Sequence, residues 1–209
     1  IRRETPIAIA RAEEGRISPV TAVEEIQSVL PRDAIVTVDS GEHYFFATHY
    51  LRTSVPDGFM VMTGLGAMAN SIGGAIGAQL AAPGRRVATI VGDGGFLMAC
   101  GEIATIAELG LPISFYVFND RRLGMVELGN MAIFGRTPSY PTGPVDLAAL
   151  AASLGAQSFV VTAPGQIKEI EAQRSPQRPI VVDVRVDTRV RFPKNGRFEA
   201  LGKSGQGVS

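Results

Sequence analysis

The sequence predicts an α/β fold with three layers, in which a mainly parallel six-stranded sheet carries helices on both faces. Two observations support this fold class. Short runs of branched and aromatic residues, bounded by glycine or proline, alternate along the chain with longer segments of helical composition. Two of these runs, residues 87–91 and 113–118, are continuously apolar, which is typical of strands buried on both faces of a parallel sheet.

The predicted elements begin at residue 18. A helix is expected over residues 18–30, because Ser18 suits the N-cap, Pro19 suits the first helical position, and the apolar residues that follow share one face. A second helix, rich in glycine and alanine, is expected over residues 68–80. The other expected elements are strands 34–38, 59–62, 87–91, 113–118, 159–161 and 180–184 and helices 96–109, 145–154 and 166–174.

Both ends of the chain differ in composition from this alternating region, which spans residues 18–188 and is expected to be one domain. Residues 1–17 are polar and irregular, which suits an interdomain linker. Residues 189–209 carry charge and glycine without periodicity, which suits a mobile tail. Because the chain starts at Ile1 and has no methionine before Met60, we expect it to be a piece of a longer protein.

Composition narrows the class of protein. The chain of 209 residues is 45% hydrophobic but has no apolar run of 18 residues, so we expect a soluble protein without a membrane partner. The formal net charge of zero provides no excess of basic side chains for nucleic acid. The one cysteine, Cys100, cannot form an internal disulfide and fits a reducing compartment, so a cytoplasmic location is expected.

Two carboxylates follow the two continuously apolar strands. Asp93 comes directly after strand 87–91 within a glycine-rich turn, and Asp120 follows strand 113–118. The carboxyl ends of parallel strands form the ligand-binding edge of open α/β sheets, so the two groups are expected to meet beside the N-terminus of the intervening helix. That arrangement suits a hard divalent cation held against a diphosphate.

A second glycine-rich turn allows a different interpretation. Gly64-x-Gly66-x-x-Ala69 follows strand 59–62 and opens the next helix, as in the loose fingerprint of dinucleotide-binding proteins. The acidic residue expected at the tip of the next strand is poorly placed, because Asp93 lies 29 residues beyond Gly64 and within its own turn. A nicotinamide- or flavin-binding module stays an alternative, beside a purely structural role of these glycines.

Three motifs, in order and spacing, resemble the diphosphate-binding domain of thiamine diphosphate enzymes. They are Asp39-Ser40-Gly41-Glu42-His43, then Gly64-Leu65-Gly66-Ala67-Met68, then Gly92-Asp93-Gly94 with Asp120 27 residues after Asp93 and Leu123-Gly124-Met125-Val126 beyond it. The pattern is most similar to the acetolactate synthase group of carboligases and decarboxylases and covers residues 18–185. The resemblance implies thiamine diphosphate and Mg²⁺ as cofactors and a 2-oxo acid as substrate.

The resemblance assigns the metal and the phosphates to particular residues. Asp93 and Asp120 would bind Mg²⁺ through their carboxylates and Arg122 through its main-chain carbonyl, with diphosphate oxygens completing the octahedron. Backbone N–H groups would meet the phosphates, helped by helix N-termini. The residues implied for this second role are Gly41, Glu42, His43, Gly94 and Gly95.

The resemblance also assigns the organic part of the cofactor. Met68 would wedge between the two rings and impose the bent conformation, which is the catalytic role implied for it. The Gly66 carbonyl and the Met68 N–H would hold the aminopyrimidine ring, and Gly124 and Met125 of the last motif would also bind the cofactor. Spacing alone favours an ordinary core methionine at position 68; only the family register reverses that interpretation.

Two positions depart from the family pattern. Asp120 stands where the family usually has asparagine, and its extra negative charge beside the diphosphate is repulsive. Arg121 and Arg122 either offset that charge or are solvated surface groups. Gly129 stands where acetolactate synthases carry a substrate-pocket tryptophan, so substrate specificity is not carried over.

The resemblance covers only part of an enzyme. In this family a glutamate on a different domain activates the pyrimidine ring; Glu102 cannot replace it and is interpreted as a surface charge. We therefore expect a pyrimidine-binding domain, on the same full-length protein or on a separate subunit, and a homo- or hetero-oligomer formed through the helices after Gly41 and Gly66. The enzyme would decarboxylate or ligate 2-oxo acids. A non-catalytic domain of the same fold that binds a partner remains an alternative.

Overall fold

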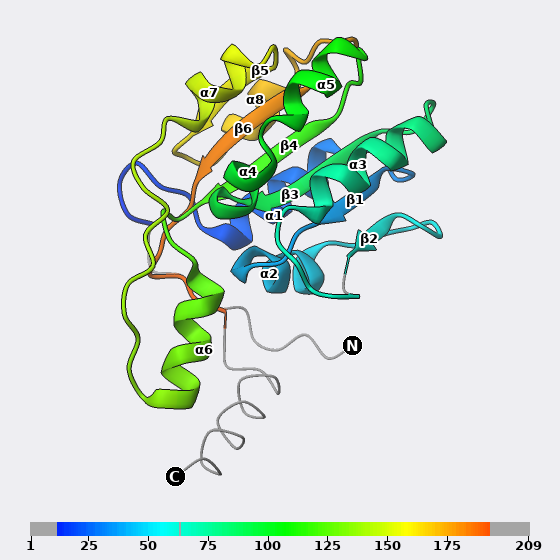
Figure 1. The fold of residues 1–209 in the computed structure, drawn as a ribbon. Coiled ribbons are helices and arrows are strands. Elements are labelled where there is room, and N and C mark those ends of the chain that lie inside the picture. Colours follow the sequence, from blue (N-terminus) through cyan, green and yellow to red (C-terminus); the bar gives the residue numbers. More distant parts are fainter. Residues whose placement is uncertain (1–11, 63, 193–209) are drawn as a thin grey trace.

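The computed structural model describes residues 12–62 and 64–192, and within them it forms one six-stranded sheet (Figure 1). All strand pairs are parallel, and the order across the sheet is β2-β1-β3-β4-β6-β5. The predicted α/β class and its six strands are therefore confirmed. The strands are β1 (Ile35–Val38), β2 (Phe59–Val61), β3 (Val87–Gly92), β4 (Ser114–Asn119), β5 (Gln157–Val161) and β6 (Ile180–Arg185).

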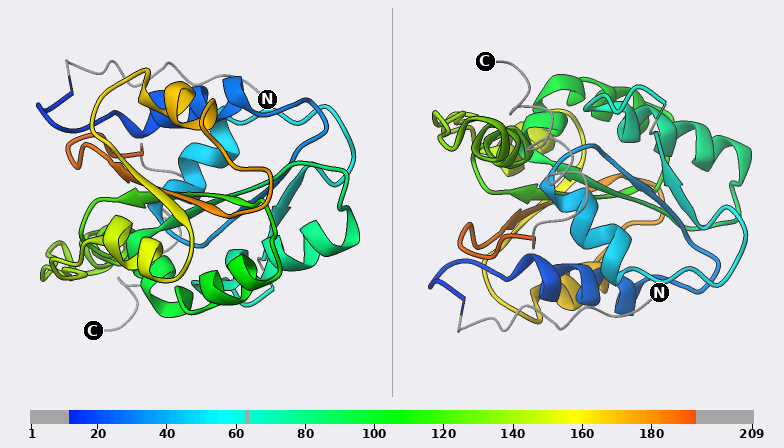
Figure 2. Two further views of the ribbon diagram at one scale, coloured as in Figure 1. Left: turned by 90° about the horizontal axis from the view of Figure 1, so that it is seen from above. Right: turned by 90° about the horizontal axis from the view of Figure 1, so that it is seen from below.

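Helices cover both faces of the sheet, which gives the three predicted layers (Figure 2). One face packs on α1 (Pro19–Val29), α2 (Glu42–Tyr50) and α8 (Gln166–Glu171), and the buried residues of these helices form one core with the sheet. The other face packs on α3 (Asn70–Ala81), α4 (Asp93–Ala99), α5 (Glu102–Glu108) and α7 (Leu147–Ser153), with a second core. The sheet is thus buried on both sides, as its apolar strands predict.

The first helix forms as its sequence predicts. Ser18 is the N-cap, and its hydroxyl accepts a hydrogen bond from Val20 N at 3.2 Å, while Pro19 occupies the first helical position. The predicted apolar face is buried, since Val23 and Ile26 have no exposed surface and Val20 and Leu30 are only 8% exposed. Local capping and the apolar stripe therefore determine this element together.

Three helical segments differ from the prediction. The single helix expected over 96–109 starts earlier, at Asp93, and divides into α4 and α5. Between them, Ile103 N donates to the Cys100 carbonyl and Ala104 N to the Gly101 carbonyl, and these i to i+3 hydrogen bonds tighten the turn. Periodicity did not predict α2 or α6 (Gly124–Phe134), although the family resemblance implied a helix after Gly41, where α2 lies. The apolar residues of α6 are spread around the helix and form no stripe on one face, and only Gly124 and Glu127 are buried.

The described ends of the chain pack on the domain. Ile17 is fully buried and pairs in parallel with Val186, just after β6. At the other end, the Phe192 ring lies 5.6 Å from the Phe45 ring and 5.5 Å from the Phe46 ring of α2. The bounds 18–188 stay a prediction, because most of the predicted linker and tail, residues 1–11 and 193–209, lies outside the described residues. None of the described helices is long and apolar enough to cross a bilayer.

Candidate cofactor site

A cavity of about 320 Å³ opens at the carboxyl end of the sheet. Its walls come from the segments that follow β1, β3, β4 and β6 and from the loop before α3. The residues predicted to bind the metal or the cofactor all line it, although the three motifs lie far apart in sequence. They are Gly41, Glu42, His43, Gly66, Met68, Asp93, Gly94, Gly95, Asp120, Arg122, Gly124 and Met125.

Asp93, the first residue of α4, is 4% exposed in the wall of the cavity. The Thr142 hydroxyl donates a hydrogen bond to its carboxylate. The pKa of Asp93 is raised to about 6, chiefly by burial; the Thr142 hydrogen bond lowers it, and the nearby Asp120 carboxylate adds to the rise. The carboxylate is therefore held in place but poorly solvated, and a bound cation would stabilise its charged form.

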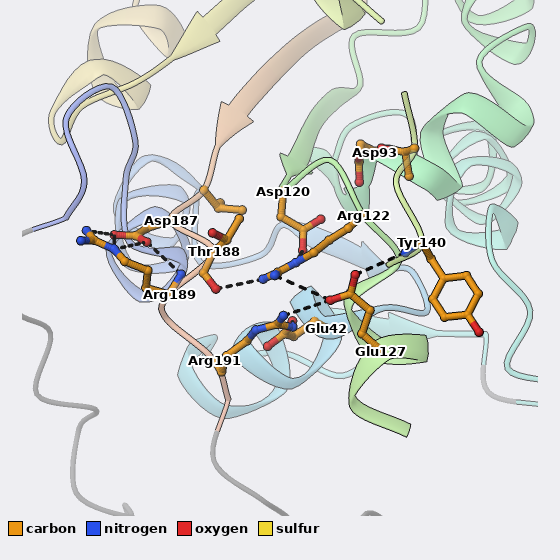
Figure 3. Close-up of polar contacts among 12 residues, drawn as sticks. Glu42, Asp93, Asp120, Arg122, Glu127, Tyr140, Asp187, Thr188, Arg189 and Arg191 are labelled. Atoms are coloured by element: carbon orange, nitrogen blue, oxygen red, sulfur yellow. Dashed lines mark hydrogen bonds and ion pairs between the residues drawn. The ribbon is translucent and has the colours of Figure 1, made fainter. Parts of the chain in front are cut away.

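Asp120, rather than Asn119, lines the cavity and provides its second predicted metal-binding side chain. Asn119 points away from it and donates a hydrogen bond from Nδ2 to Asp183 Oδ1 at 2.8 Å. Asp120 lies 3.2 Å from Nε of Arg122 (Figure 3). Burial raises the pKa of Asp120, and the Arg122 charge partly offsets this effect. Arg122 is thus an ion-pair partner of the cavity and not a solvated surface group.

The main chain around Arg122 is fixed by a short antiparallel pairing with residues 140–142. Leu123 N donates to the Tyr140 carbonyl at 2.9 Å, and Thr142 N donates to the Arg121 carbonyl at 3.2 Å. In such a pair the polar groups of the central residue point away from the partner strand, so the Arg122 carbonyl is left for another ligand. Arg121 has a positive φ of 58°, an uncommon conformation for a residue with a side chain.

The metal ligands predicted here do not form a complete cage by themselves. Among residues 12–62 and 64–192, no group of three or more His, Cys, Asp or Glu side chains is placed to hold a metal ion. Two carboxylates and one main-chain carbonyl leave half of an octahedron to be filled, which is how Mg²⁺ binds when substrate phosphates supply the other ligands. The donor set therefore fits Mg²⁺ only together with a diphosphate.

Gly94 and Gly95, in the glycine-rich turn after β3 (the phosphate turn), lie so close to neighbouring side chains that an added Cβ would clash with them. A Cβ on Gly94 would lie 3.1 Å from the Met68 methyl group and 2.8 Å from Leu123 Cδ2. A Cβ on Gly95 would come closer than 3.0 Å to Asp39 Oδ2. Asp39 itself is a buried cap of α3, because its carboxylate accepts hydrogen bonds from Ala69 N at 2.8 Å and from Ser71 N at 3.3 Å. The phosphate turn after β3 therefore packs directly against Asp39 at the end of β1 and against the loop before α3.

His43 presents an unpartnered nitrogen at the cavity. Its ring is 7% exposed, and its Nε2 atom is buried without a hydrogen-bond partner among the described residues. Burial lowers the pKa of His43 to about 4, so the free chain carries a neutral imidazole at pH 7. Gly41 and Gly92 flank the ring so closely that a Cβ on Gly92 would lie 3.0 Å from it. An anion in the cavity would accept a hydrogen bond from this nitrogen once the imidazole is protonated.

An ionic network closes the cavity on the side of α6. Arg191 donates from Nη1 to Glu42 Oε2 at 2.8 Å and from Nη2 to Glu127 Oε2 at 3.1 Å (Figure 3). Arg122 also approaches Glu127, at 3.7 Å, and donates to the Thr188 carbonyl at 2.9 Å. Burial raises the pKa of Glu42, with Asp120 adding to the shift and Arg191 opposing it. The segment after β6 therefore takes part in the site.

Four residues of the site were not identified from the sequence in the roles that the structure gives them. They are Asp39, which caps α3, Glu127 and Arg191 of the ionic network, and Thr142, which holds Asp93. Thr142 lies 49 residues from Asp93, and Arg191 lies 149 residues from Glu42, so no local pattern connects them. Glu102 is exposed on α5 and is not part of the cavity wall, in agreement with its interpretation as a surface charge.

Residues 39–184 match a known protein family, described as "Thiamine pyrophosphate enzyme, C-terminal TPP binding domain". The chain belongs to this family. The matched range contains all of the predicted cofactor and metal residues. The resemblance to thiamine diphosphate enzymes is therefore confirmed, and with it the predicted cofactor class, for which Mg²⁺ is the usual partner in this family.

Individual members of the family show how much of an enzyme this chain represents. It is 31% identical over 193 residues to a probable acetolactate synthase large subunit of Methanococcus aeolicus, which covers 88% of the chain and 32% of that protein. It is 32% identical over 173 residues to an acetolactate synthase of Bacillus subtilis, covering 82% of the chain and 30% of that protein. The chain thus spans about a third of the length of these curated relatives.

A solved structure supports the fold independently. A thiamine diphosphate-dependent 4-hydroxybenzoylformate decarboxylase of Rhodococcus jostii superposes with a TM-score of 0.76 over 88% of this chain and 35% of that chain, at 20% sequence identity. At this identity the likeness concerns the fold alone. It agrees with the all-parallel sheet and its helices described above.

The dinucleotide interpretation of Gly64 to Ala69 conflicts with the geometry at the start of α3. In that interpretation, free N–H groups at the helix N-terminus would bind a pyrophosphate. Here the Asp39 carboxylate already accepts the N–H groups of Ala69 and Ser71 and brings a negative charge to this helix end. In the described structure, Gly66 and Met68 of this turn line the cavity instead.

Proposed function

We propose that this chain is the diphosphate- and magnesium-binding part of a thiamine diphosphate-dependent enzyme that decarboxylates 2-oxo acids or joins them to an acceptor carbonyl. One observation carries the proposal: the motif residues expected to bind metal, phosphate and pyrimidine line a single cavity at the carboxyl end of the sheet. The relatives named acetolactate synthase favour the carboligase reaction, and the structural neighbour is a decarboxylase.

In this proposal Mg²⁺ is held by the carboxylates of Asp93 and Asp120 and by the Arg122 carbonyl. Support comes from the unsolvated Asp93 carboxylate, fixed by Thr142, and from the free side of the Arg122 main chain. The structure offers these donors at one wall of the cavity, so the chain's part is to fix the cation and, through it, the diphosphate.

The diphosphate would lie where three chain turns meet. Main-chain N–H groups of Gly94 and Gly95 at the start of α4, and of Glu42 and His43 at the start of α2, would donate to its oxygens. The buried Nε2 atom of His43 would gain a partner there, and an adjacent anion would raise the pKa of this imidazole from about 4.

Met68 is proposed to support the bent form of the cofactor. The Met68 methyl group lies 3.1 Å from where a Cβ on Gly94 would be, so Met68 packs on the phosphate turn. Met68 and Gly66 both line the cavity. Gly124 and Met125 line the same cavity from the N-terminus of α6. When bound, thiamine diphosphate supplies the carbon that attacks the substrate carbonyl and accepts the electrons left when CO₂ departs. The side chains described here bind and orient it.

The activating carboxylate is proposed to come from a pyrimidine-binding domain outside this chain, on the full-length protein or on another subunit. The chain spans about a third of its relatives' length, which leaves room for such a domain in a complete enzyme. Leu65, between Gly64 and Gly66 beside the cavity, is 95% exposed and would be covered by that domain or by a second copy. We propose an oligomer on the same ground, and a cytoplasmic location stays a prediction.

Substrate choice is proposed to differ from that of typical acetolactate synthases. Gly129 of α6 stands at the position where they carry tryptophan, and no atom of the described residues lies within 4 Å of where its Cβ would be, so this part of α6 faces open space within the described chain. A larger acceptor or a larger 2-oxo acid would find room there. Comparing turnover of small and bulky 2-oxo acids by the complete enzyme tests this point.

Calorimetric titration of the full chain with three ligands tests the proposed function. Thiamine diphosphate with Mg²⁺ is expected to bind, whereas NAD and FAD are expected to give no heat of specific binding. Binding of NAD or FAD, with no response to thiamine diphosphate, would support the dinucleotide alternative. If none of the three binds, the chain is a non-catalytic member that keeps the fold, and the proposal fails.

A further inference from the structure

Arg191 joins three parts of the chain that meet behind the cavity wall. It lies in the segment after β6, and its guanidinium binds Glu42 at the first turn of α2 and Glu127 near the start of α6, at 2.8 and 3.1 Å (Figure 3). Phe192 N also donates to the other oxygen of Glu42, at 3.3 Å. Both oxygens of the Glu42 carboxylate are therefore held by the segment 191–192.

Glu42 lies next to the second predicted metal ligand. A Cβ on Gly124 would lie 2.6 Å from Glu42 Oε2, 3.1 Å from Asp120 Oδ2 and 3.4 Å from Arg191 Nη1. The three charged groups thus surround a point that only glycine leaves empty. The side chains of Glu42 and Asp120 are 10% and 16% exposed, so water screens their repulsion poorly.

Carboxylates outnumber guanidinium groups in this corner of the described chain, and Arg191 reduces the excess of negative charge. Among the described residues, and apart from Asp187, which lines the cavity and is paired with Arg189, Glu42, Asp93, Asp120 and Glu127 bring four carboxylates to this corner, whereas Arg122 and Arg191 bring two guanidinium groups. Arg122 is engaged with Asp120, Glu127 and the Thr188 carbonyl. Arg191 is thus the guanidinium that compensates Glu42, which lines the cavity.

We propose that Arg191 is a positioning residue for the cofactor's diphosphate: by pairing with Glu42, it removes the repulsion that this carboxylate would exert on an anion beside Asp120. This inference rests on the proposed function, because it needs a diphosphate in the cavity. It also couples the segment after β6 to cofactor affinity, since Arg191 and Phe192 reach Glu42 from that segment. The ring of Phe192, packed on α2, holds the segment in register.

A simpler role for Arg191 is to tether the chain to α2 without influencing the cavity. The two roles differ in what removal of Glu42 does. If Arg191 compensates charge, Glu42→Gln removes the repulsion and makes Arg191 dispensable for diphosphate binding. If Arg191 is only a tether, Glu42→Gln breaks the same contact and is as harmful as Arg191→Gln.

A double-mutant cycle in the full chain tests the inference by calorimetry with thiamine diphosphate and Mg²⁺, and separately with inorganic pyrophosphate and Mg²⁺. Arg191→Gln is expected to weaken both ligands about tenfold, between the small effect of an exposed ion pair and the larger one of a buried pair. Arg191→Lys should retain most of the affinity, because it keeps the charge. Glu42→Gln should bind at least as tightly as wild type, and Glu42→Gln/Arg191→Gln should bind more tightly than Arg191→Gln.

The control is Arg178→Gln, which removes the same charge at the opposite edge of the sheet, where Arg178 donates to the Gly155 carbonyl at 2.8 Å. It should bind like wild type. Wild-type affinity of Arg191→Gln, or a double variant as weak as Arg191→Gln, overturns the inference while leaving the proposed function intact. A wild-type chain that binds neither ligand overturns both. Circular dichroism of each free variant shows whether it is folded.

Discussion

Replacing Gly95 by alanine should disrupt part of the contact between α4 and α3 and lower the free energy of unfolding. The added Cβ would come closer than 3.0 Å to Asp39 Oδ2, and it would also lie 3.2 Å from Val91 Cγ2 and 3.4 Å from Ala69 N. Asp39 is 2% exposed and has no room to turn without giving up the hydrogen bonds that it accepts from Ala69 N and Ser71 N. The substitution therefore disturbs a buried cap as well as a packed contact.

The expected change in the free energy of unfolding combines two destabilising contributions and one stabilising contribution. Overpacking a well-filled site costs about 1–3 kcal/mol, and a weakened buried hydrogen bond costs about 1–3 kcal/mol more. Alanine in place of glycine within a helix returns up to about 1 kcal/mol. We therefore expect the free energy of unfolding to fall by about 2–4 kcal/mol. Because Ala69 follows Met68, the affinity for thiamine diphosphate should fall as well.

Urea unfolding followed by circular dichroism measures this change. Gly73→Ala is the matched control: Gly73 also lies in a helix of the same layer, but no atom of the residues that the structure describes lies within 4 Å of its Cβ position. Its free energy of unfolding should stay equal or rise by up to about 1 kcal/mol. If Gly95→Ala is as stable as Gly73→Ala, the close contact between Gly95 and Asp39 does not exist as described.

Three further predictions concern the site itself. Asp120→Asn should keep or improve Mg²⁺-dependent thiamine diphosphate binding by calorimetry, because it removes one of two buried carboxylates that repel each other; a large loss would show that the second charge is required. Magnesium-dependent binding should strengthen from about pH 5 to about pH 7.5, because Asp93, with a pKa of about 6, must be ionised to hold the cation. In the free chain the contribution of Asp93 to stability should instead fall as pH rises from 3.8 to about 6. Calorimetry tests the first trend, and urea unfolding tests the second. The chain alone should exchange the C2 proton of bound thiamine diphosphate, followed by NMR in deuterated water, no faster than free cofactor does, and added pyrimidine-binding domain should accelerate it; fast exchange by the chain alone would place the activating group within it.

The strands and the first helix could be predicted because local sequence determines them. The apolar runs of β3 and β4 have only one stable environment, a sheet covered on both faces, and they are buried as expected. Ser18 and Pro19 fix the start of α1. The helices α2 and α6 could not be predicted in the same way. α2 does not separate its polar and apolar residues onto two faces, and the apolar residues of α6 are spread around the helix, so neither shows a helical period.

The glycines of α3 show the limit of composition as a guide. Gly73, Gly74 and Gly77 would each permit close backbone approach, but only a Cβ on Gly74 would meet another part of the described chain, the Met62 side chain. The other two face open space there. A glycine-rich helix thus indicates that close packing is possible, whereas the partner that uses it is set by the tertiary structure.

The sequence could predict that the motif residues gather at one cavity, but not which contacts support them there. The motifs placed carboxylates and glycines at strand ends, and parallel topology alone brings strand ends to one edge. The partners of these residues are distant in sequence, as Thr142 is from Asp93 and Arg191 is from Glu42. Such contacts depend on how the segments 135–146 and 186–192 return to the sheet edge, and no periodicity or local motif encodes those paths.

The most direct test of the central claim is whether the chain binds thiamine diphosphate through Mg²⁺ and Asp93. Calorimetry should show binding by wild type with Mg²⁺ and a loss of binding when a chelator removes the metal. Asp93→Ala should abolish the metal-dependent part, because it removes a charged ligand, whereas Glu102→Ala, which removes an exposed carboxylate of the neighbouring helix α5, should bind like wild type. Unchanged binding by Asp93→Ala, or equal affinity with and without Mg²⁺, would contradict the assignment of this cavity as the magnesium and diphosphate site.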